Sequence, residues 1–152
     1  MMAATGVLVA AVFYILNMRA TLQTRQAQLF MQIYSKWSEE DWSVQHLILG
    51  KTFDQSYDDF KKNVLNNTEE MKKFQSLMRF YEGLGVLVKE KLIHIRLVAL
   101  TMAGDTIRYW EQVKPIIMNM RADLKYPRLQ SETEYLYFEL LRYIDEHPEL
   151  KT

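Results

Sequence analysis

Three histidines and a few pairs of acids are the side chains of this sequence that could hold a metal ion or move a proton. His46, His94 and His147 lie far apart, and none has a second histidine or a carboxylate pair at metal-ligand spacing. The pairs Asp58-Asp59 and Glu69-Glu70 fall at expected helix starts, where negative charge opposes the helix dipole favourably. We therefore predict no metal site, and helix capping accounts for the acids without general acid–base catalysis.

The chain also lacks the usual groups for nucleophilic and nucleotide chemistry. It has no cysteine, which removes thiolate nucleophiles, disulfides, iron–sulfur clusters and all-cysteine zinc sites, and no serine lies in a nucleophile elbow. Gly83-x-Gly85 is half of a dinucleotide fingerprint, but position 88 is valine and a helix, not a strand, is expected before it. These glycines are expected instead to let another helix approach closely, or to supply a left-handed cap. The sequence predicts no catalytic residue and no cofactor.

Aromatic and methionine side chains are the remaining candidates for a ligand site. Five of them form the candidate cluster: Tyr81, Tyr109, Trp110, Met120 and Phe138. They could line an adaptable apolar pocket, or they could form a core of amphipathic aromatics whose polar atoms reach the surface. We favour the core, and the pocket stays open as the alternative.

The first structural element that the sequence predicts lies at the N-terminus. Residues 1–18 contain no side chain that is charged at neutral pH, and apart from the phenol of Tyr14 only Thr5 is polar between Ala3 and Leu16. As a helix this run is roughly 27 Å long, which is the lower end of what crosses a hydrocarbon core. A cleaved signal peptide would need a basic start and a small-x-small site, whereas Asn17-Met18-Arg19 follows the run. We expect an uncleaved anchor over residues 1–18; a signal peptide and a buried core helix are the alternatives.

Charge predicts how the anchor is oriented. Arg19, Arg25 and Lys36 precede the first acid, Glu39, and no charged side chain lies on the N-terminal flank. Because cytoplasmic flanks carry the basic excess, we expect a single-pass protein of the cell membrane whose body is cytoplasmic.

The neutral net charge of the chain hides an uneven distribution. The chain has 19 basic and 19 acidic side chains, and because only bases occur before Glu39, the rest is slightly acidic. This excludes nucleic acid as an expected partner. Within the body, residues 72–96 are basic and residues 132–152 acidic. These are either solvated faces that attract each other, or a basic surface for anionic lipid headgroups or an acidic partner.

The rest of the chain divides into a neck and a body. Residues 19–28 are polar on nearly every face and are expected to form a juxtamembrane neck that need not pack on anything. An apolar stripe at helical spacing then opens a domain over residues 29–152: Leu29, Phe30, Ile33, Tyr34 and Trp37.

Capping boxes predict where the helices of this domain begin. In such a box a short polar side chain accepts from free amides and an acid three residues later reaches back. The chain has four of them: Ser38 with Asp41 before a segment over Trp42–Leu49, Ser56 with Asp59, Asn67 with Glu70, and Ser131 with Glu134.

Two stretches in the middle of the body are ambiguous. Residues 86–97 fit either a hairpin or a helix that stops at Gly104, and we favour the helix because a lone hairpin has no third strand. Pro115 must kink or restart the next helical run, because proline lacks the donor to the carbonyl of Glu111. The predicted fold class is all-α, with a transmembrane helix continuing into a bundle of about five to six helices.

Part of the chain resembles a known family. The residues that carry the likeness are Phe80-Tyr81-Glu82-Gly83-Leu84-Gly85-Val86-Leu87-Val88, Leu92-Ile93, Trp110-Glu111-Gln112-Val113-Lys114-Pro115-Ile116 and Arg121. They resemble a family of uncharacterised prokaryotic proteins that join one N-terminal membrane helix to a small helical domain of unknown function. The chain departs from the family pattern at Lys89-Glu90-Lys91, where a glycine is expected in the turn. The resemblance implies this architecture, and it implies no activity or site residues.

These observations favour a non-catalytic function. We expect a membrane-anchored interaction or scaffolding protein whose partners are the lipid bilayer and either another protein or a second copy, since Gly6 and Ala10 form a small-xxx-small face. The alternatives are a membrane-tethered small-molecule sensor with its pocket around Trp110, and, ranked last, a membrane-bound enzyme.

Overall fold

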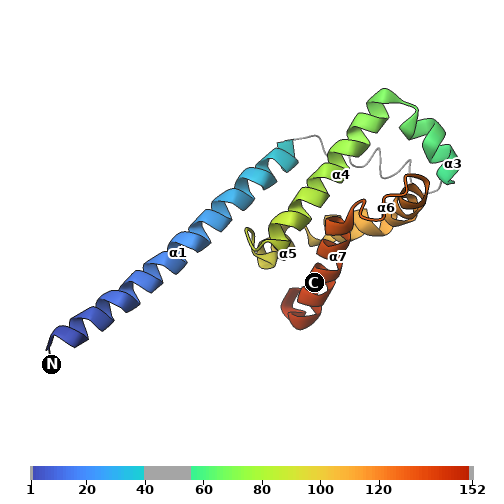
Figure 1. The fold of residues 1–152 in the computed structure, drawn as a ribbon. Coiled ribbons are helices and arrows are strands. Elements are labelled where there is room, and N and C mark those ends of the chain that lie inside the picture. Colours follow the sequence, from blue (N-terminus) through green and yellow to red (C-terminus); the bar gives the residue numbers. More distant parts are fainter. Residues whose placement is uncertain (1, 40–55, 151–152) are drawn as a thin grey trace.

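The computed structural model describes residues 2–39 and 56–150, and within them every regular element is a helix (Figure 1). The elements are α1 (Met2–Glu39), α3 (Tyr57–Phe60), a π-helical turn η1 (Lys61–Leu65), α4 (Thr68–Lys89), α5 (Ile95–Thr101), α6 (Ala103–Asp123), α7 (Ser131–Glu146) and a 3₁₀ turn η2 (Pro148–Leu150). The predicted all-α fold is confirmed. The segment expected over Trp42–Leu49 lies outside the described residues.

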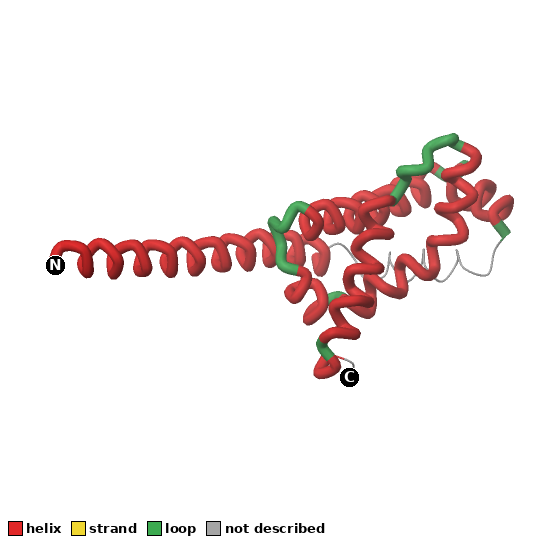
Figure 2. The backbone as a smooth tube through the Cα atoms, turned by 60° about the horizontal axis from the view of Figure 1, so that its bottom comes forward, coloured by secondary structure: helices red, strands yellow, loops and turns green. Residues whose placement is uncertain are grey.

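Helix α1 is one continuous helix of 38 residues, and its N-terminal part projects away from the body (Figure 2). No glycine or proline after Gly6 interrupts it. By length and composition, the stretch Gly6–Lys36 is long and apolar enough to cross a membrane. Its most apolar part is 0% buried within the protein. A signal sequence passes the same test, whereas the alternative of a buried core helix is wrong.

The C-terminal part of α1 packs on the body through the apolar stripe. Phe30 is buried, its ring centroid lies 5.9 Å from that of Tyr34, and Leu29 and Ile33 are partly buried against the same core. Contact with the body begins before the stripe, because Gln26 Nε2 donates to the carbonyl of Lys91 at 2.9 Å. The neck was not required to pack on anything, and in the structure Gln26 nevertheless joins it to the body, because its amide pairs with a carbonyl exposed by a turn.

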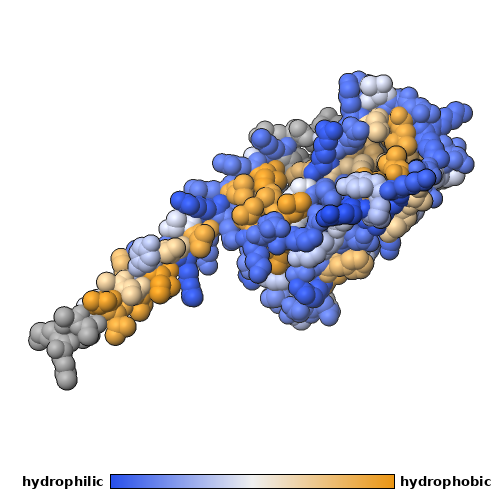
Figure 3. Space-filling view, in the orientation of Figure 1, coloured by the Kyte–Doolittle hydropathy of each residue, from blue (hydrophilic) through white to orange (hydrophobic). Residues whose placement is uncertain are grey.

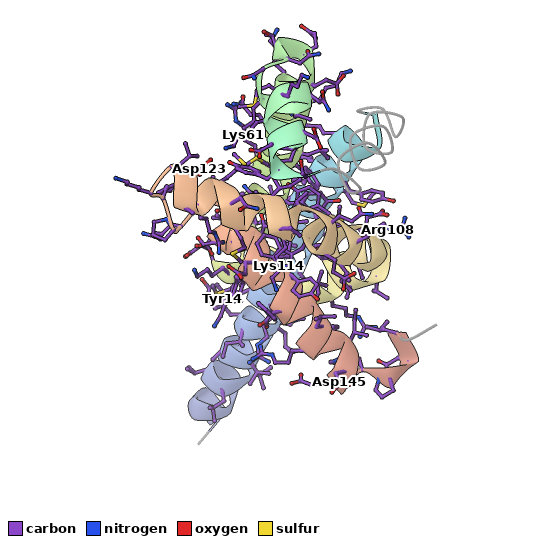
Figure 4. All side chains as sticks on the ribbon, turned by 90° about the vertical axis from the view of Figure 1, so that its right-hand side faces the viewer. Tyr14, Lys61, Arg108, Lys114, Asp123 and Asp145 are labelled. Atoms are coloured by element: carbon purple, nitrogen blue, oxygen red, sulfur yellow. The ribbon has the colours of Figure 1, made fainter. Side chains whose placement is uncertain are left out.

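Two of the predicted caps hold the starts of helices in the body. Ser56 Oγ accepts from the amide of Asp59 at 3.2 Å, and Asn67 Oδ1 accepts from the amides of Glu69 and Glu70 at 3.1 and 3.3 Å. At the far end of the body, Lys61 lies 3.0 Å from Asp123 and so joins η1 to the end of α6 (Figure 4). Hydrogen bonds from Lys61 and then Tyr57 hold the pKa of the Asp123 carboxyl below its usual range.

The ambiguous residues 86–97 form the end of one helix, a turn and the start of another. Helix α4 ends at Lys89, and the carbonyl of Leu87 accepts from the amides of Leu92 and Ile93 at 2.9 and 3.1 Å. Lys91 has φ 58°, a left-handed conformation that favours glycine. The hairpin alternative is wrong, and the turn forms with lysine, not glycine, at the left-handed position.

The boundary between α5 and α6 differs slightly from the prediction. The break lies at Met102, and Gly104 is inside the first turn of α6. Pro115 is also inside α6, which continues to Asp123, so of the two expectations, a kink or a restart, the restart does not occur. The core lies where these helices meet, and its largest fully buried side chains include Phe60, Phe74, Tyr81, Leu84, Tyr109, Trp110, Ile117, Leu136 and Leu140.

Candidate functional site

The candidate aromatic residues lie where α4 meets α6. The rings of Tyr81 and Tyr109 stack with centroids 4.0 Å apart and planes 16° from parallel. Trp110 is fully buried beside Tyr109, and Met120 is buried nearly three turns further along α6. The two described pockets of the body are lined by other residues. The packing of these four side chains is that of a core.

Phe138 does not join this cluster, contrary to the prediction from the sequence. Its side chain is 55% exposed, and its ring makes an edge contact with Tyr137 at 5.1 Å. The inward face of α7 is formed by Thr133, Leu136 and Leu140, which follow a helical period. Position 138 lies midway between the last two and therefore faces solvent.

Three polar atoms in or near the aromatic cluster are buried without a hydrogen-bond partner among the described residues. They are Tyr109 Oη, Trp110 Nε1 and Gln112 Oε1. An unpaired buried donor or acceptor costs about 1–3 kcal/mol of desolvation. The aromatic centre is therefore apolar and tightly packed, at a cost in unmade hydrogen bonds.

The two stacked tyrosines make the body sensitive to alkali. Burial raises the pKa of both phenols above the usual value, with further contributions from Asp105 at Tyr81 and from Tyr81 and Glu82 at Tyr109. When the pKa of an acid is higher in the folded than in the unfolded protein, the folded state loses stability as the pH rises above the pKa of the unfolded state. The reason is that only the unfolded chain then releases the proton. We expect the free energy of unfolding to fall above about pH 10, by about 1.4 kcal/mol per pH unit for each tyrosine.

The Tyr109→Phe variant tests this account. At pH 7 it is expected to be more stable by about 1 kcal/mol, because the change removes the unpaired hydroxyl and keeps the stacked ring. Above pH 10 its stability is expected to fall less steeply than that of the unmodified chain. Urea unfolding of the full chain in detergent micelles, followed by near-ultraviolet circular dichroism, measures both. A variant that is destabilised at pH 7 would contradict the assignment of Tyr109 Oη as unpaired.

A second cluster of polar groups joins α4 to the N-terminus of α7, and we call it the α4–α7 junction. Glu82 Oε2 accepts from the amides of Glu132 and Thr133 at 3.2 and 2.9 Å and lies 3.0 Å from the Thr133 hydroxyl. A carboxylate here satisfies free amides and opposes the positive end of the helix dipole. Glu82 thus caps α7 from a different helix.

The predicted cap at Ser131 is wrong. Ser131 is the first residue of α7, and the residue before it, Gln130, has φ 57° and makes no side-chain cap. Glu134, the other half of the predicted box, is held by Arg121 at 2.9 Å instead. The amide of Glu134, which the Ser131 hydroxyl would cap, donates instead to the carbonyl of Gln130 at 3.1 Å. Glu82 accepts from the amides of Glu132 and Thr133, so the local capping box does not form.

Gln130 holds the chain that enters α7. Its buried amide donates to the carbonyl of Met78 on α4 at 3.0 Å, and its Oε1 lies 2.9 Å from the Thr133 hydroxyl. That hydroxyl has one proton, which it shares between Gln130 and Glu82. Hydrogen bonds from Gln130 and to Glu82 therefore both hold the first turn of α7 against α4.

Gly85 is what allows the two helices of the junction to meet. A Cβ built at Gly85 would lie 2.1 Å from the carbonyl oxygen of Glu132, whereas a Cβ at Gly83 would meet nothing within 4 Å. Lys89, one turn further along α4, lies 2.7 Å from Glu132. The hydrogen bond from Lys89 holds the pKa of Glu132 below its usual range. The close-approach expectation is confirmed at Gly85, and no described glycine has the left-handed conformation of the alternative cap.

The sequence analysis did not predict that Glu82 caps α7, although the spacing of residues along α4 indicates a contact there. Met78, Glu82, Gly85 and Lys89 recur at spacings of four, three and four, so they share one face of α4. An acid and a glycine on the core side of an amphipathic helix indicate that another backbone approaches there. The sequence could have predicted a contact, but not which helix makes it.

A third feature lies between the neck and the turn after α4. A pocket of about 260 Å³ there is lined by Gln26 and by residues from the end of α4, the turn, the start of α5 and α7: Val88, Lys89, Lys91, Ile93, His94, Ile95, Tyr135 and Glu139. Arg19, Arg25 and Lys36, which predicted the orientation, are exposed along α1. Within residues 2–39 and 56–150, no group of three or more potential metal ligands comes together.

Comparison with known proteins identifies a family. A family model described as a domain of unknown function (DUF4760) matches residues 1–139, which include α1 and most of the body. No curated protein and no solved structure matches the chain significantly.

Proposed function

The chain belongs to the DUF4760 family of domains of unknown function, and from this premise we propose that it is a membrane-anchored, non-catalytic interaction or scaffolding protein. In this proposal residues 1–18 span the cell membrane once, residues 19–28 form the neck, and the helical body over residues 29–152 lies in the cytoplasm. The partners are the bilayer and either a second copy or another protein.

The observation that carries the proposal is the form of α1. Its apolar side chains between Val7 and Met18 are exposed to solvent, whereas Phe30 at its other end is buried in the body. At 1.5 Å per residue the helix is roughly 57 Å long, enough to cross a hydrocarbon core of about 30 Å and still reach the body. The projecting part is predominantly hydrophobic, and blue polar side chains follow it where α1 meets the body (Figure 3). The family match takes in this helix together with the body.

The polar groups of the body favour scaffolding over catalysis. Glu82 is engaged by the first turn of α7, Lys89 by Glu132, and Arg121 by Glu134. These groups stabilise contacts between helices: Lys89 and Arg121 are paired with carboxylates, and Glu82 is hydrogen-bonded to amides. On α1, a Cβ at Gly6 would meet nothing within 4 Å, so its face is free to pack on a second anchor.

Single-cysteine labelling tests the topology, since the chain has no cysteine of its own. In intact cells a membrane-impermeant maleimide is expected to label Ala3→Cys but not Leu124→Cys, which becomes reactive only after permeabilisation. Intact mass of the membrane fraction is expected to show the uncleaved chain. The reverse labelling pattern would overturn the orientation, a shortened chain would establish a signal peptide, and crosslinking that stays monomeric would remove the second-copy partner.

A small-molecule sensor is the second candidate, and the unpaired atoms of Tyr109, Trp110 and Gln112 are the observation in its favour. A ligand that paired with them would recover the cost of their burial. Such a ligand would have to open the packed core, and it would raise the thermal stability of the unmodified chain more than that of Tyr109→Phe. Equal shifts across a library of polar aromatic compounds would count against the sensor.

A further inference from the structure

The turn after α4 lies on the side of the body that faces the N-terminal part of α1. Helix α4 runs opposite to α1, so its C-terminal turn lies at the end of the body that faces the N-terminus of α1 (Figures 1 and 2). The hydrogen bond from Gln26 to the carbonyl of Lys91 fixes the turn at this height on α1. We call residues 90–96 the membrane-facing turn.

Its height places it beside the headgroups if α1 spans the bilayer. With the hydrocarbon boundary at Met18, Gln26 lies eight residues further, which is roughly 12 Å along the helix. The headgroup layer on each side of the bilayer is about 5–8 Å thick. An extended lysine side chain covers the remaining distance, and tilting of the anchor brings the turn closer.

The side chains on the membrane-facing turn suit an anionic lipid surface. Lys91 and Arg96 are exposed, and neither forms an ion pair with a described carboxylate. Leu92 lies between them and is 51% exposed, although its neighbour Ile93 is buried. An exposed leucine flanked by two unpaired cations is the pattern of a loop that inserts an apolar tip among anionic headgroups.

Other charges near the turn modify this balance. Glu90 is exposed on the same turn and subtracts one charge, and Lys89 is already paired with Glu132. Arg19 and Arg25 lie on the stretch of α1 between the expected hydrocarbon boundary and Gln26, and both are exposed. Together with Lys91 and Arg96 they leave a net positive surface around the point where the anchor emerges.

We propose that the membrane-facing turn docks the body onto the anionic lipid surface from which α1 emerges. Lys91 and Arg96, with Arg19 and Arg25, contact lipid phosphates, while Leu92 enters the boundary between headgroups and acyl chains. This inference rests on the proposed membrane anchor. It adds that the body is held in one orientation, with α3 and the end of α6 turned toward the cytoplasm.

A fluorophore at the tip of the turn tests the proposal. The full chain with Leu92→Cys, labelled with an environment-sensitive fluorophore, is reconstituted into vesicles of phosphatidylcholine alone or with three-tenths phosphatidylglycerol. We expect a blue shift and quenching by lipid-borne quenchers only in the anionic vesicles. Neutralising Lys91→Gln and Arg96→Gln together is expected to lower the docked-to-undocked ratio about 25-fold, at about fivefold per charge. Raising the salt concentration is expected to lower it as well.

The control places the same label at Leu124→Cys, which is also exposed but lies at the far end of α6 next to Lys125. It is expected to remain in water in both vesicles, and Lys125→Gln is expected to change neither signal. A label at position 92 that stays in water in the anionic vesicles, or that is buried equally in neutral ones, would overturn the proposal. Alkaline extraction distinguishes a failure of the anchor from a failure of the docking. A chain that is extracted from the vesicles refutes the anchor itself, whereas a chain that stays embedded with a water-exposed turn refutes only the docking.

Discussion

The Gly85→Ala variant is expected to lose about 3 kcal/mol of stability against unfolding. Its Cβ would lie 2.1 Å from the carbonyl oxygen of Glu132, so the backbones of α4 and α7 would have to move apart. That movement stretches the bonds from Glu82 to the first turn of α7, which are 2.9–3.2 Å long. A clash against backbone cannot be relieved by a change of rotamer.

Gly83→Ala is the matched control, because it makes the same chemical change two residues away on the same helix. A Cβ there meets nothing within 4 Å. Alanine in a helix interior is favoured over glycine where its Cβ has room, so at the half-buried Gly83 we expect a gain of about 0.5–1 kcal/mol. Urea unfolding of both full-length variants in micelles gives the comparison. Equal effects of the two substitutions would mean that α7 does not contact α4 at Gly85.

Glu82→Ala is expected to cost about 2–4 kcal/mol, the second large effect at the α4–α7 junction. The substitution leaves the amides of Glu132 and Thr133 without their acceptor at a partly buried helix end. It also removes a negative charge from the positive end of the α7 dipole. Glu82→Gln keeps an acceptor oxygen but loses the charge, so its cost is expected to lie between that of alanine and zero.

Ser131→Ala separates the observed cap from the one that the sequence predicts. The Ser131 hydroxyl donates to the side chain of Glu132 at 3.3 Å, and α7 has no side-chain cap from its own N-cap residue. We expect this variant to change stability by less than about 0.5 kcal/mol. If Ser131→Ala costs about 1 kcal/mol or more while Glu82→Ala is neutral, the local capping box forms in solution and the cap from α4 does not. The same unfolding measurement decides between them.

Gly85→Ala and Glu82→Ala both act on the α4–α7 junction. We therefore expect that their effects on stability are not independent. Gly85 sets the distance between the helices, and Glu82 uses that distance to reach the amides of α7. In the double variant Gly85→Ala/Glu82→Ala, the total loss is therefore expected to be smaller than the sum of the two single losses. An additive result would mean that α7 is capped in the same way when the helices are apart.

Several features of the protein follow from neighbouring residues alone. The uncharged run over residues 1–18 and the absence of glycine and proline after Gly6 predict one long helix, because the relevant forces act within a few residues of each position. The caps at Ser56 and Asn67 also form as predicted, since each side chain bonds to amides two or three residues away. The helical period of the apolar residues was sufficient to predict an all-α fold.

Other features depend on residues far apart in the sequence. Ser131 and Asn67 carry the same local signal, yet only Asn67 acts as a cap, because Glu82 reaches the start of α7 from 50 residues away. The period of α7 likewise allows either side of the helix to face inward, and its contact with α4 turns Phe138 to solvent. A local pattern specifies which groups need a partner. The tertiary contact decides which partner they receive, because the hydrogen bond or burial that prevails is the one whose geometry the packed helices already provide.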